Sequence, residues 1–287
     1  MGLSFANRVG IAAGFDKNGT AVDGLLALGF GHVEVGTVTP KPQAGNPQPR
    51  VFRLVAANAL INRMGFPNDG AERVVARLKS RTRKGVVGVN IGKNAVTPLE
   101  RAVDDYVACF RVVASVADYV TVNVSSPNTA GLRTLQQADQ LRPLLGAVLD
   151  EARTYEVSSG RKVPILLKVS PDVSDEGLEE IGAVARSLPV AGIIATNTTL
   201  ARDAVQGQLH AQETGGLSGP PLVRRSREAV RLLRSVVGQQ FCIVGVGGVS
   251  SAEDARLLRE AGADLVQVYT ALVYRGPGLV RELASAL

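Results

Sequence analysis

Eight short apolar segments, separated by stretches of helical periodicity, dominate the 287-residue sequence. Most of these segments are near-continuous apolar runs, which is the pattern of strands buried on both faces of a parallel sheet. Strands are expected at Val9–Gly14, His32–Thr37, Val86–Gly92, Tyr119–Ser125, Ile165–Ser170, Gly192–Thr198, Cys242–Gly248 and Leu265–Thr270. Amphipathic helices are expected at Ala21–Leu28, Ala71–Ser80, Leu99–Ala117, Leu141–Thr154, Glu176–Leu188, Leu222–Val237 and Ala252–Ala261. This alternation predicts either a (β/α)8 barrel or a doubly wound sheet.

The turn after the first strand separates these two folds. A doubly wound dinucleotide-binding sheet is expected to carry G-x-G-x-x-G at this point, whereas the chain reads Gly14-Phe15-Asp16-Lys17. The one glycine-rich turn, Gly245–Gly248, follows the seventh strand. We therefore predict an α/β fold in which residues 1–287 form a single (β/α)8 TIM barrel.

Composition excludes several classes of protein. With 45% apolar residues the chain is not disordered, and no apolar run is long enough to span a bilayer. Two cysteines cannot build a disulfide framework, so a reducing cytoplasm is expected. The net charge is +6, but the cations are scattered and no aromatic residues are interleaved with them. Nucleic acid is therefore not expected as a partner.

The polar residues at the C-terminal strand ends indicate the chemistry of the site, because barrel enzymes react at that face. These ends carry amides, hydroxyls and ammonium groups, which suit a planar, polar, anionic ligand. Three of the seven lysines, Lys17, Lys93 and Lys168, lie there, and we expect all three to contribute to function. His32 opens its strand at the opposite end and His210 lies in a loop, so neither a metal site nor a histidine-based triad is expected.

Two segments stand out as parts of this site. Gly245–Gly248 either forms a tight turn that needs glycine or cradles a phosphate, and Tyr269-Thr270 at the next strand end favours the phosphate. Asn123–Asn128 either caps a helix or places two asparagines and two serines over the barrel mouth. A serine there could accept a proton only with a relay or from a very acidic C–H bond.

Taken together, the motifs closely resemble those of the class 2 dihydroorotate dehydrogenases, the FMN enzymes of pyrimidine synthesis that reduce quinone. The resemblance spans nearly the whole chain and rests on segments in the expected order. They are Ala12–Gly19, Glu34–Pro40, Ile61–Phe66, Asn90–Asn94, Asn123–Arg133, Ala195–Thr199, Thr214–Gly219 and Gly245–Gly248. Class 1 relatives carry cysteine where this chain has Ser126.

The resemblance implies a role for each matched residue. Ser126 would take a proton from C5 of dihydroorotate while hydride leaves C6 for the flavin, with Thr129 and Phe66 beside it. The substrate would be held by Lys17, Asn62, Arg63, Met64, Gly65, Phe66, Asn123, Asn128, Asn197 and Thr198. FMN, at the C-terminal face, would be held by Ala13, Gly14, Lys17, Thr37, Asn90, Asn123, Lys168, Thr196, Gly219, Gly248, Tyr269 and Thr270. Lys168 would stabilise negative charge at the N1/C2 edge of the flavin.

The resemblance also bears on the electron acceptor and the location of the protein. Class 2 members carry an N-terminal extension that lies on the membrane and forms the quinone tunnel, whereas the barrel motifs of this sequence begin within its first ten residues. We expect this chain by itself to be soluble and cytoplasmic, and a form with the extension to lie peripherally on the cytoplasmic side of the membrane. Arg53, from the family's Phe-Arg-Leu segment near the flavin edge, is present.

Two other functions remain open at this point. One is a different FMN barrel reductase acting on a pyrimidine, although such enzymes use cysteine as the proton donor. The other is a basic barrel that serves as a scaffold without catalysis.

Overall fold

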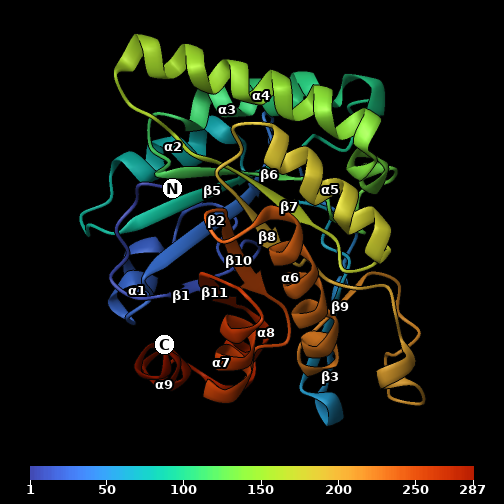
Figure 1. Ribbon diagram of the computed structural model, residues 1–287. Coiled ribbons are helices and arrows are strands. Elements are labelled where there is room, and N and C mark those ends of the chain that lie inside the picture. The colour runs from blue at the N-terminus through green and yellow to red at the C-terminus, as the bar shows by residue number, and fades with distance from the viewer.

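Eight parallel strands close into a barrel in the computed structural model, which describes residues 1–287 (Figure 1). In order around the barrel they are β1 (Val9–Ile11), β11 (Leu265–Val268), β10 (Cys242–Val246), β8 (Gly192–Ala195), β7 (Ile165–Val169), β6 (Tyr119–Asn123), β5 (Val86–Ile91) and β2 (His32–Val38). The predicted TIM barrel is confirmed. All eight strands begin at the predicted residue, and most end earlier, because the polar residues that follow leave the ladder at the barrel mouth.

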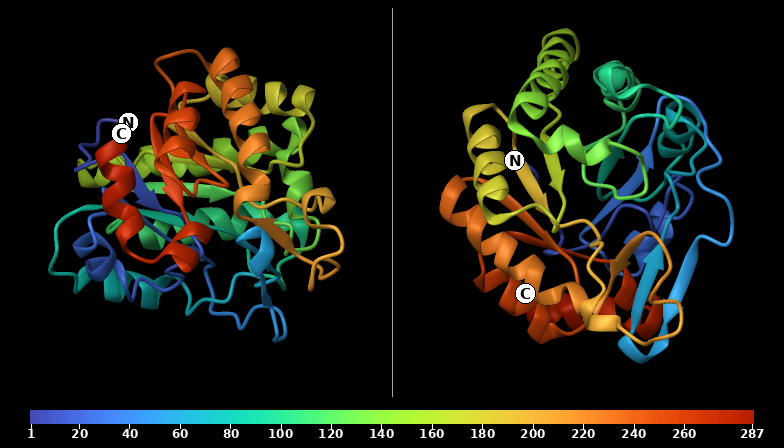
Figure 2. Two further views of the ribbon diagram at one scale, coloured as in Figure 1. Left: turned by 90° about the horizontal axis from the view of Figure 1, so that it is seen from below. Right: turned by 90° about the vertical axis from the view of Figure 1, so that its right-hand side faces the viewer.

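Helices surround the barrel and bury the outward-facing strand residues (Figures 1 and 2). They are α1 (Val22–Ala27), α2 (Ala71–Lys79), α3 (Ala102–Val113), α4 (Ala138–Ser159), α5 (Asp175–Ser187), α6 (Val223–Val237), α7 (Ala252–Glu260), α8 (Thr270–Arg275) and α9 (Gly278–Ala286). Helices α8 and α9 were not predicted from the sequence, and α4 is longer than predicted. Ser174 and Ser251 cap α5 and α7 with side-chain oxygens that accept from backbone N–H groups of the first turn.

The inside of the barrel is apolar on one side and polar on the other. Side chains alternate along each strand, so one set faces the helices and the other fills the barrel. Leu166, Ile194, Val244 and Leu265 form the apolar side. The polar side is made by buried residues of β2, β5, β6, β7 and β11, which are His32, Glu34, Asn90, Tyr119, Thr121, Lys168 and Gln267.

A small antiparallel sheet stands beside the barrel (Figure 2). It consists of β3 (Val51–Leu54), β4 (Ala59–Asn62) and β9 (Gly216–Ser218), with β4 in the middle. Its core is a separate apolar cluster that includes Phe52, Ile61 and Leu217. These three strands were not predicted from the sequence, because strands this short pair only with partners far along the chain. The strands of this sheet lie in the connections that follow β2 and β8, so the sheet lies at the C-terminal mouth of the barrel.

The long helices of the structure are amphipathic. None of them combines the length and the apolar composition needed to cross a bilayer.

Gly88 on β5 leaves the space that the ring of Tyr119 occupies, and a Cβ atom added there would overlap that ring. We expect Gly88→Ala to lower the free energy of unfolding by about 1–3 kcal/mol through overpacking. Gly146→Ala is the control, because its Cβ on α4 would meet no atom within 4 Å and should stabilise the helix by about 0.5–1 kcal/mol. Urea denaturation followed by circular dichroism measures both, and equal midpoints for Gly88→Ala and wild type would contradict this account of the barrel interior.

Candidate active site

Two adjoining cavities open at the C-terminal end of the barrel. The larger has a volume of about 330 Å³ and the smaller about 90 Å³. Six residues line both cavities and form their shared wall: Ala13, Lys168, Asn197, Thr198, Ser218 and Tyr269. A ligand in one cavity therefore lies against a ligand in the other.

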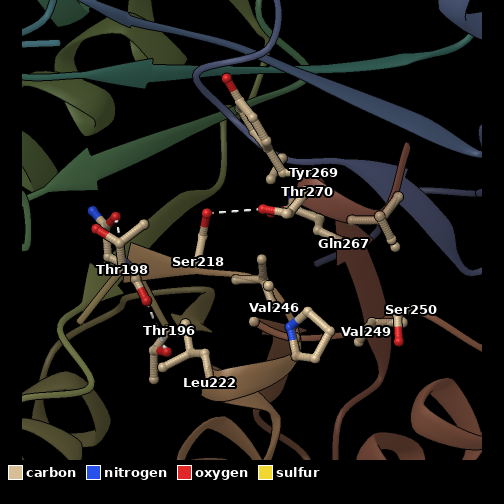
Figure 3. A pocket seen from close by; sticks show the side chains of 18 of the residues that line it. Thr196, Thr198, Ser218, Leu222, Val246, Val249, Ser250, Gln267, Tyr269 and Thr270 are labelled. Atoms are coloured by element: carbon tan, nitrogen blue, oxygen red, sulfur yellow. Dashed lines mark hydrogen bonds between the residues drawn. The ribbon is translucent and has the colours of Figure 1, made fainter. Parts of the chain in front are cut away.

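The outer end of the larger cavity has the form of a phosphate cradle. Gly247 and Gly248 have φ values of 128° and 81°, which favour glycine, and a Cβ on Gly248 would overlap the backbone of Val223 at the start of α6. Opposite this turn, Thr270 donates a hydrogen bond of 2.8 Å to the Oγ of Ser218 (Figure 3). Backbone N–H groups of a glycine turn and nearby hydroxyls suit a phosphate.

Gly219 shapes the same cavity by close backbone approach. Its φ is 103°, and a Cβ there would lie 2.8 Å from the carbonyl oxygen of Asn58 and 3.1 Å from the Cγ2 of Thr270. The chain between β9 and α6 can therefore pass over the cavity only with glycine at this position.

Two lysines, the buried Lys168 and the partly buried Lys17, dominate the electrostatics. Lys168 lines both cavities, and burial lowers the pKa of its ammonium, with Glu34 opposing this shift. Burial also lowers the pKa of Lys17 to about 8, helped by the positive charges of Arg50 and Lys168. No acidic side chain lines the smaller cavity, so two cations face it without a counter-charge in its wall. This arrangement calls for an anionic ligand.

Four asparagines from separate segments line the smaller cavity: Asn62, Asn123, Asn128 and Asn197. Asn128 donates to the Oδ1 of Asn62 at 3.1 Å, which joins the loop after β6 to the end of β4. Amides supply both donors and acceptors, so they fit a planar ring whose edges carry N–H and C=O groups.

The two adjacent serines after β6 have different surroundings. The Oγ of Ser125 donates to the Oδ1 of Asn123 at 2.9 Å and accepts from the Nδ2 of Asn197 at 2.9 Å. Ser126 lines the smaller cavity, and its Oγ accepts from the backbone N–H of Asn128 at 3.2 Å. The hydroxyl proton of Ser125 is thus committed to the protein, whereas Ser126 is the one of the two serines that lines the cavity.

An ion pair between Arg133 and Asp172 holds together the loops that carry these residues. Arg133 donates to the carbonyl of Ser125 at 3.1 Å and to that of Thr198 at 3.0 Å, and it pairs with Asp172 at 2.7 Å. Asp172 in turn accepts from the Oγ of Thr199 and from a backbone N–H. The loops after β6, β7 and β8 are therefore tied together, which limits their movement over the smaller cavity.

The structure brings most of the predicted site residues together, but Arg63, Thr129 and Asn90 line neither cavity. Arg63 turns away, pairing with Glu213 at 2.6 Å and lying 4.5 Å from the ring centre of Phe52. Thr129 lies in a turn, where its carbonyl accepts from a backbone N–H. Asn90 is fully buried beneath the smaller cavity.

The expectation that Lys93 belongs to the site is wrong. Its ammonium donates to the carbonyl oxygens of Asn94 and Thr97 at 3.2 and 2.9 Å and lies in the field of Asp105. The chain turns outward after β5, so a lysine two residues beyond the strand's end stabilises a loop instead of facing the mouth.

Several cavity residues were not singled out by sequence reasoning. Ser218 lines both cavities, and Asn58 and Tyr274 line the larger one. Ser218 lies in the Thr214–Gly219 motif, so that motif was the available signal. The guanidinium of Arg53 lies 6.0 Å from the ring centre of Tyr274, beside this cavity.

Comparison with known proteins gives matches that extend over the entire chain. The sequence model of the family described as "Dihydroorotate dehydrogenase" matches residues 1–287. The chain is 53% identical over 287 residues to the dihydroorotate dehydrogenase (quinone) of Burkholderia pseudomallei strain 668, covering 100% of this chain and 84% of that protein. It is equally similar, at 53%, to the Burkholderia ambifaria protein of the same name, of which it covers 83%.

Solved structures give the same result. The crystal structure of Eimeria tenella DHODH in complex with ferulenol superposes with a TM-score of 0.94 at 41% identity, covering 99% of this chain and 81% of that one. The ligand-free form from the same organism gives a TM-score of 0.91 at 41% identity, covering 100% and 84%.

Proposed function

The chain belongs to the dihydroorotate dehydrogenase family, and from this membership we propose that it oxidises dihydroorotate to orotate in pyrimidine biosynthesis, with FMN as its cofactor and a quinone as the final electron acceptor. The curated relatives named above are quinone enzymes, and Ser126 is the residue type of class 2. The observation that carries the proposal is the smaller cavity, where two lysines and four asparagines lie against a larger cavity that ends in a glycine turn suited to a phosphate.

The residues of the larger cavity fit FMN. Gly248 and Thr270 at its outer end suit a terminal phosphate, and no second glycine motif offers a place for an adenylate. Lys168 at its inner end has a buried ammonium that faces the cavity. A positive charge in this place would stabilise negative charge on the N1/C2 edge of a flavin. When bound, FMN would supply hydride acceptance.

The residues of the smaller cavity fit dihydroorotate. The ammonium of Lys17 would bind the carboxylate, and the asparagine amides would bind the N–H and C=O edges of the ring. Phe66, which is buried at a φ of 53° directly after Gly65, would close the cavity on the ring. Substrate binding in this way positions the ring against the wall shared with the larger cavity.

Ser126 is the group we assign as the base. It would accept the proton from C5 as hydride leaves C6, so the substrate loses one proton and one hydride and gains the C5–C6 double bond. The backbone N–H of Asn128, at 3.2 Å from the Oγ of Ser126, holds this hydroxyl in place. Thr129, one residue further along, is the remaining candidate for a relay to solvent.

The alternative of a cysteine-dependent FMN reductase is disfavoured by position. Neither cysteine lines either of the two cavities of the site: Cys109 is buried on α3, and Cys242 begins β10 at the opposite end of the barrel. Association with a membrane surface and electron transfer to a quinone there stay predictions from the resemblance.

The purified protein should carry FMN, and anaerobic dihydroorotate should bleach its flavin absorbance. Extraction followed by chromatography identifies the cofactor, and a spectrophotometric titration follows the reduction. Recovery of FAD, or a flavin that dihydroorotate leaves oxidised, would contradict the proposal.

Ser126→Ala should slow reduction of the flavin by dihydroorotate by about 10²–10⁴-fold, because a positioned base contributes this much. Anaerobic stopped-flow absorbance measures the rate. Ser125→Ala is the matched control and should slow the reaction less, since the proton of Ser125 is committed to Asn123. The assignment fails if the effects of the two substitutions are exchanged, or if Ser126→Ala releases the flavin.

Orotate affinity should decline as the pH rises through about 8, which is the pKa of Lys17. The ammonium is charged below this pKa and neutral above it, so binding of the carboxylate should weaken by up to about tenfold per pH unit above it. Titrations of the flavin spectrum with orotate at several pH values measure the dissociation constant. In Lys17→Met the affinity should be lower and this step in the pH profile should be absent; a step that persists belongs to another group.

A further inference from the structure

A buried carboxylate lies inside the barrel without touching either cavity. Glu34 on β2 has no exposed surface and belongs to neither cavity lining. Three side chains donate to it: the Nδ2 of Asn90 at 2.8 Å, the hydroxyl of Tyr119 at 3.1 Å and the Nε2 of Gln267 at 3.0 Å. A carboxylate that is surrounded by donors alone is satisfied as an anion.

A directional chain of hydrogen bonds leads from this carboxylate to the smaller cavity. Because Asn90 directs its NH2 group at Glu34, its Oδ1 faces the site and accepts from the hydroxyl of Thr37 at 2.5 Å and the Nδ2 of Asn123 at 3.1 Å. The Oδ1 of Asn123 then accepts from Ser125 at 2.9 Å, and Ser125 accepts from the Nδ2 of Asn197 at 2.9 Å.

The carboxylate determines the direction of the first amide of this chain, that of Asn90. The Oδ1 atoms of Asn123 and Asn197 also accept from the backbone N–H groups of Ser125 and Thr198, at 3.2 and 2.8 Å, which orient these two amides independently. An amide can rotate by half a turn and exchange its donor and acceptor with little change in shape, whereas a carboxylate can only accept. Gln267 shows how strongly the carboxylate requires donors. Its NH2 group donates to Glu34, although its own buried Oε1 has no hydrogen-bond partner. Gln267 also lines the larger cavity, where Figure 3 labels it near Thr270.

We propose that Glu34 is a positioning residue that fixes the orientation of the Asn90 amide, and thereby the acceptor that holds Thr37 and Asn123 in the wall of the smaller cavity. This inference rests on the proposed function, because its consequence is the recognition of orotate. In the observed orientation the Oδ1 of Asn90 accepts from both Thr37 and Asn123, which line the smaller cavity. Reversal of the Asn90 amide would direct its NH2 group at the Nδ2 of Asn123 and remove the acceptor of the Thr37 hydroxyl, so both wall residues would shift against the ring.

A comparison of two substitutions separates this role from simple packing. Glu34→Gln keeps the shape of the side chain but adds a donor, so it permits the reversed orientation of the Asn90 amide. Glu34→Asp shortens the side chain but keeps an acceptor-only group. If amide orientation is what matters, Glu34→Gln should harm orotate binding more than Glu34→Asp; if packing is what matters, the order should be reversed.

The test is an equilibrium titration of the flavin-loaded proteins with orotate, followed by the flavin absorbance, with thermal unfolding measured in parallel. We expect Glu34→Gln to weaken orotate by about 10- to 100-fold, as for one misdirected buried hydrogen bond, while its unfolding temperature stays near that of the wild type. Thr121→Val is the control: Thr121 is the ladder neighbour of Asn90, is fully buried, and has a hydroxyl without a partner. Its orotate affinity should equal that of the wild type.

The outcomes distinguish this inference from the proposed function. Unchanged orotate affinity in Glu34→Gln, or a larger loss in Glu34→Asp, would overturn the inference alone. An equal loss in Thr121→Val would also overturn it, because any disturbance of the interior would then suffice. A wild-type protein that does not bind orotate would overturn the proposed function as well. If Glu34→Gln does not fold, Glu34→Asp decides, and a loss of about 100-fold in that variant would overturn the inference.

Discussion

Closure of the parallel sheet brings the C-terminal ends of eight strands to one mouth, and the candidate site depends on this constraint. Residues that are far apart in sequence, such as Lys17 after β1 and Asn197 after β8, meet there because their strands belong to the same closed ladder. The small sheet of β3, β4 and β9 adds to the wall by the same route, since it is built from connections that leave the mouth.

The interior of the barrel carries more polarity than packing alone requires. A layer of leucine and valine would fill the space at lower cost than a carboxylate, a histidine and several amides. His32 illustrates the cost: burial lowers its pKa to about 4, so it is neutral, and its Nδ1 has no partner. The polar side of the interior lies directly below the site, where Glu34 and Lys168 are charges of opposite sign on neighbouring layers. These buried polar groups lower the stability of the fold, and they place fixed charges and dipoles directly beneath the site.

Sequence reasoning succeeded where the signal was local and failed where it was not. Strand starts were predictable, because the switch from a polar to an apolar run is a property of neighbouring residues. The pairing of β4 with β9 was not, since it joins segments more than a hundred residues apart. Lys93 and Lys168 both lie near strand ends, yet one stabilises a loop and the other lines both cavities. Strand position alone does not give the direction in which a side chain points.

The sequence by itself determined the alternation of strands and helices, the absence of a dinucleotide motif and the set of polar residue types at the strand ends. These properties follow from hydrophobic periodicity and from the chemistry of individual side chains. Tertiary structure alone decided which of those residues share a cavity, that Arg63 turns to Glu213, and that Glu34 lies beneath the asparagines. Hydrogen-bond direction depends on which donors and acceptors are brought within 3 Å of one another, and only the closed barrel brings them together.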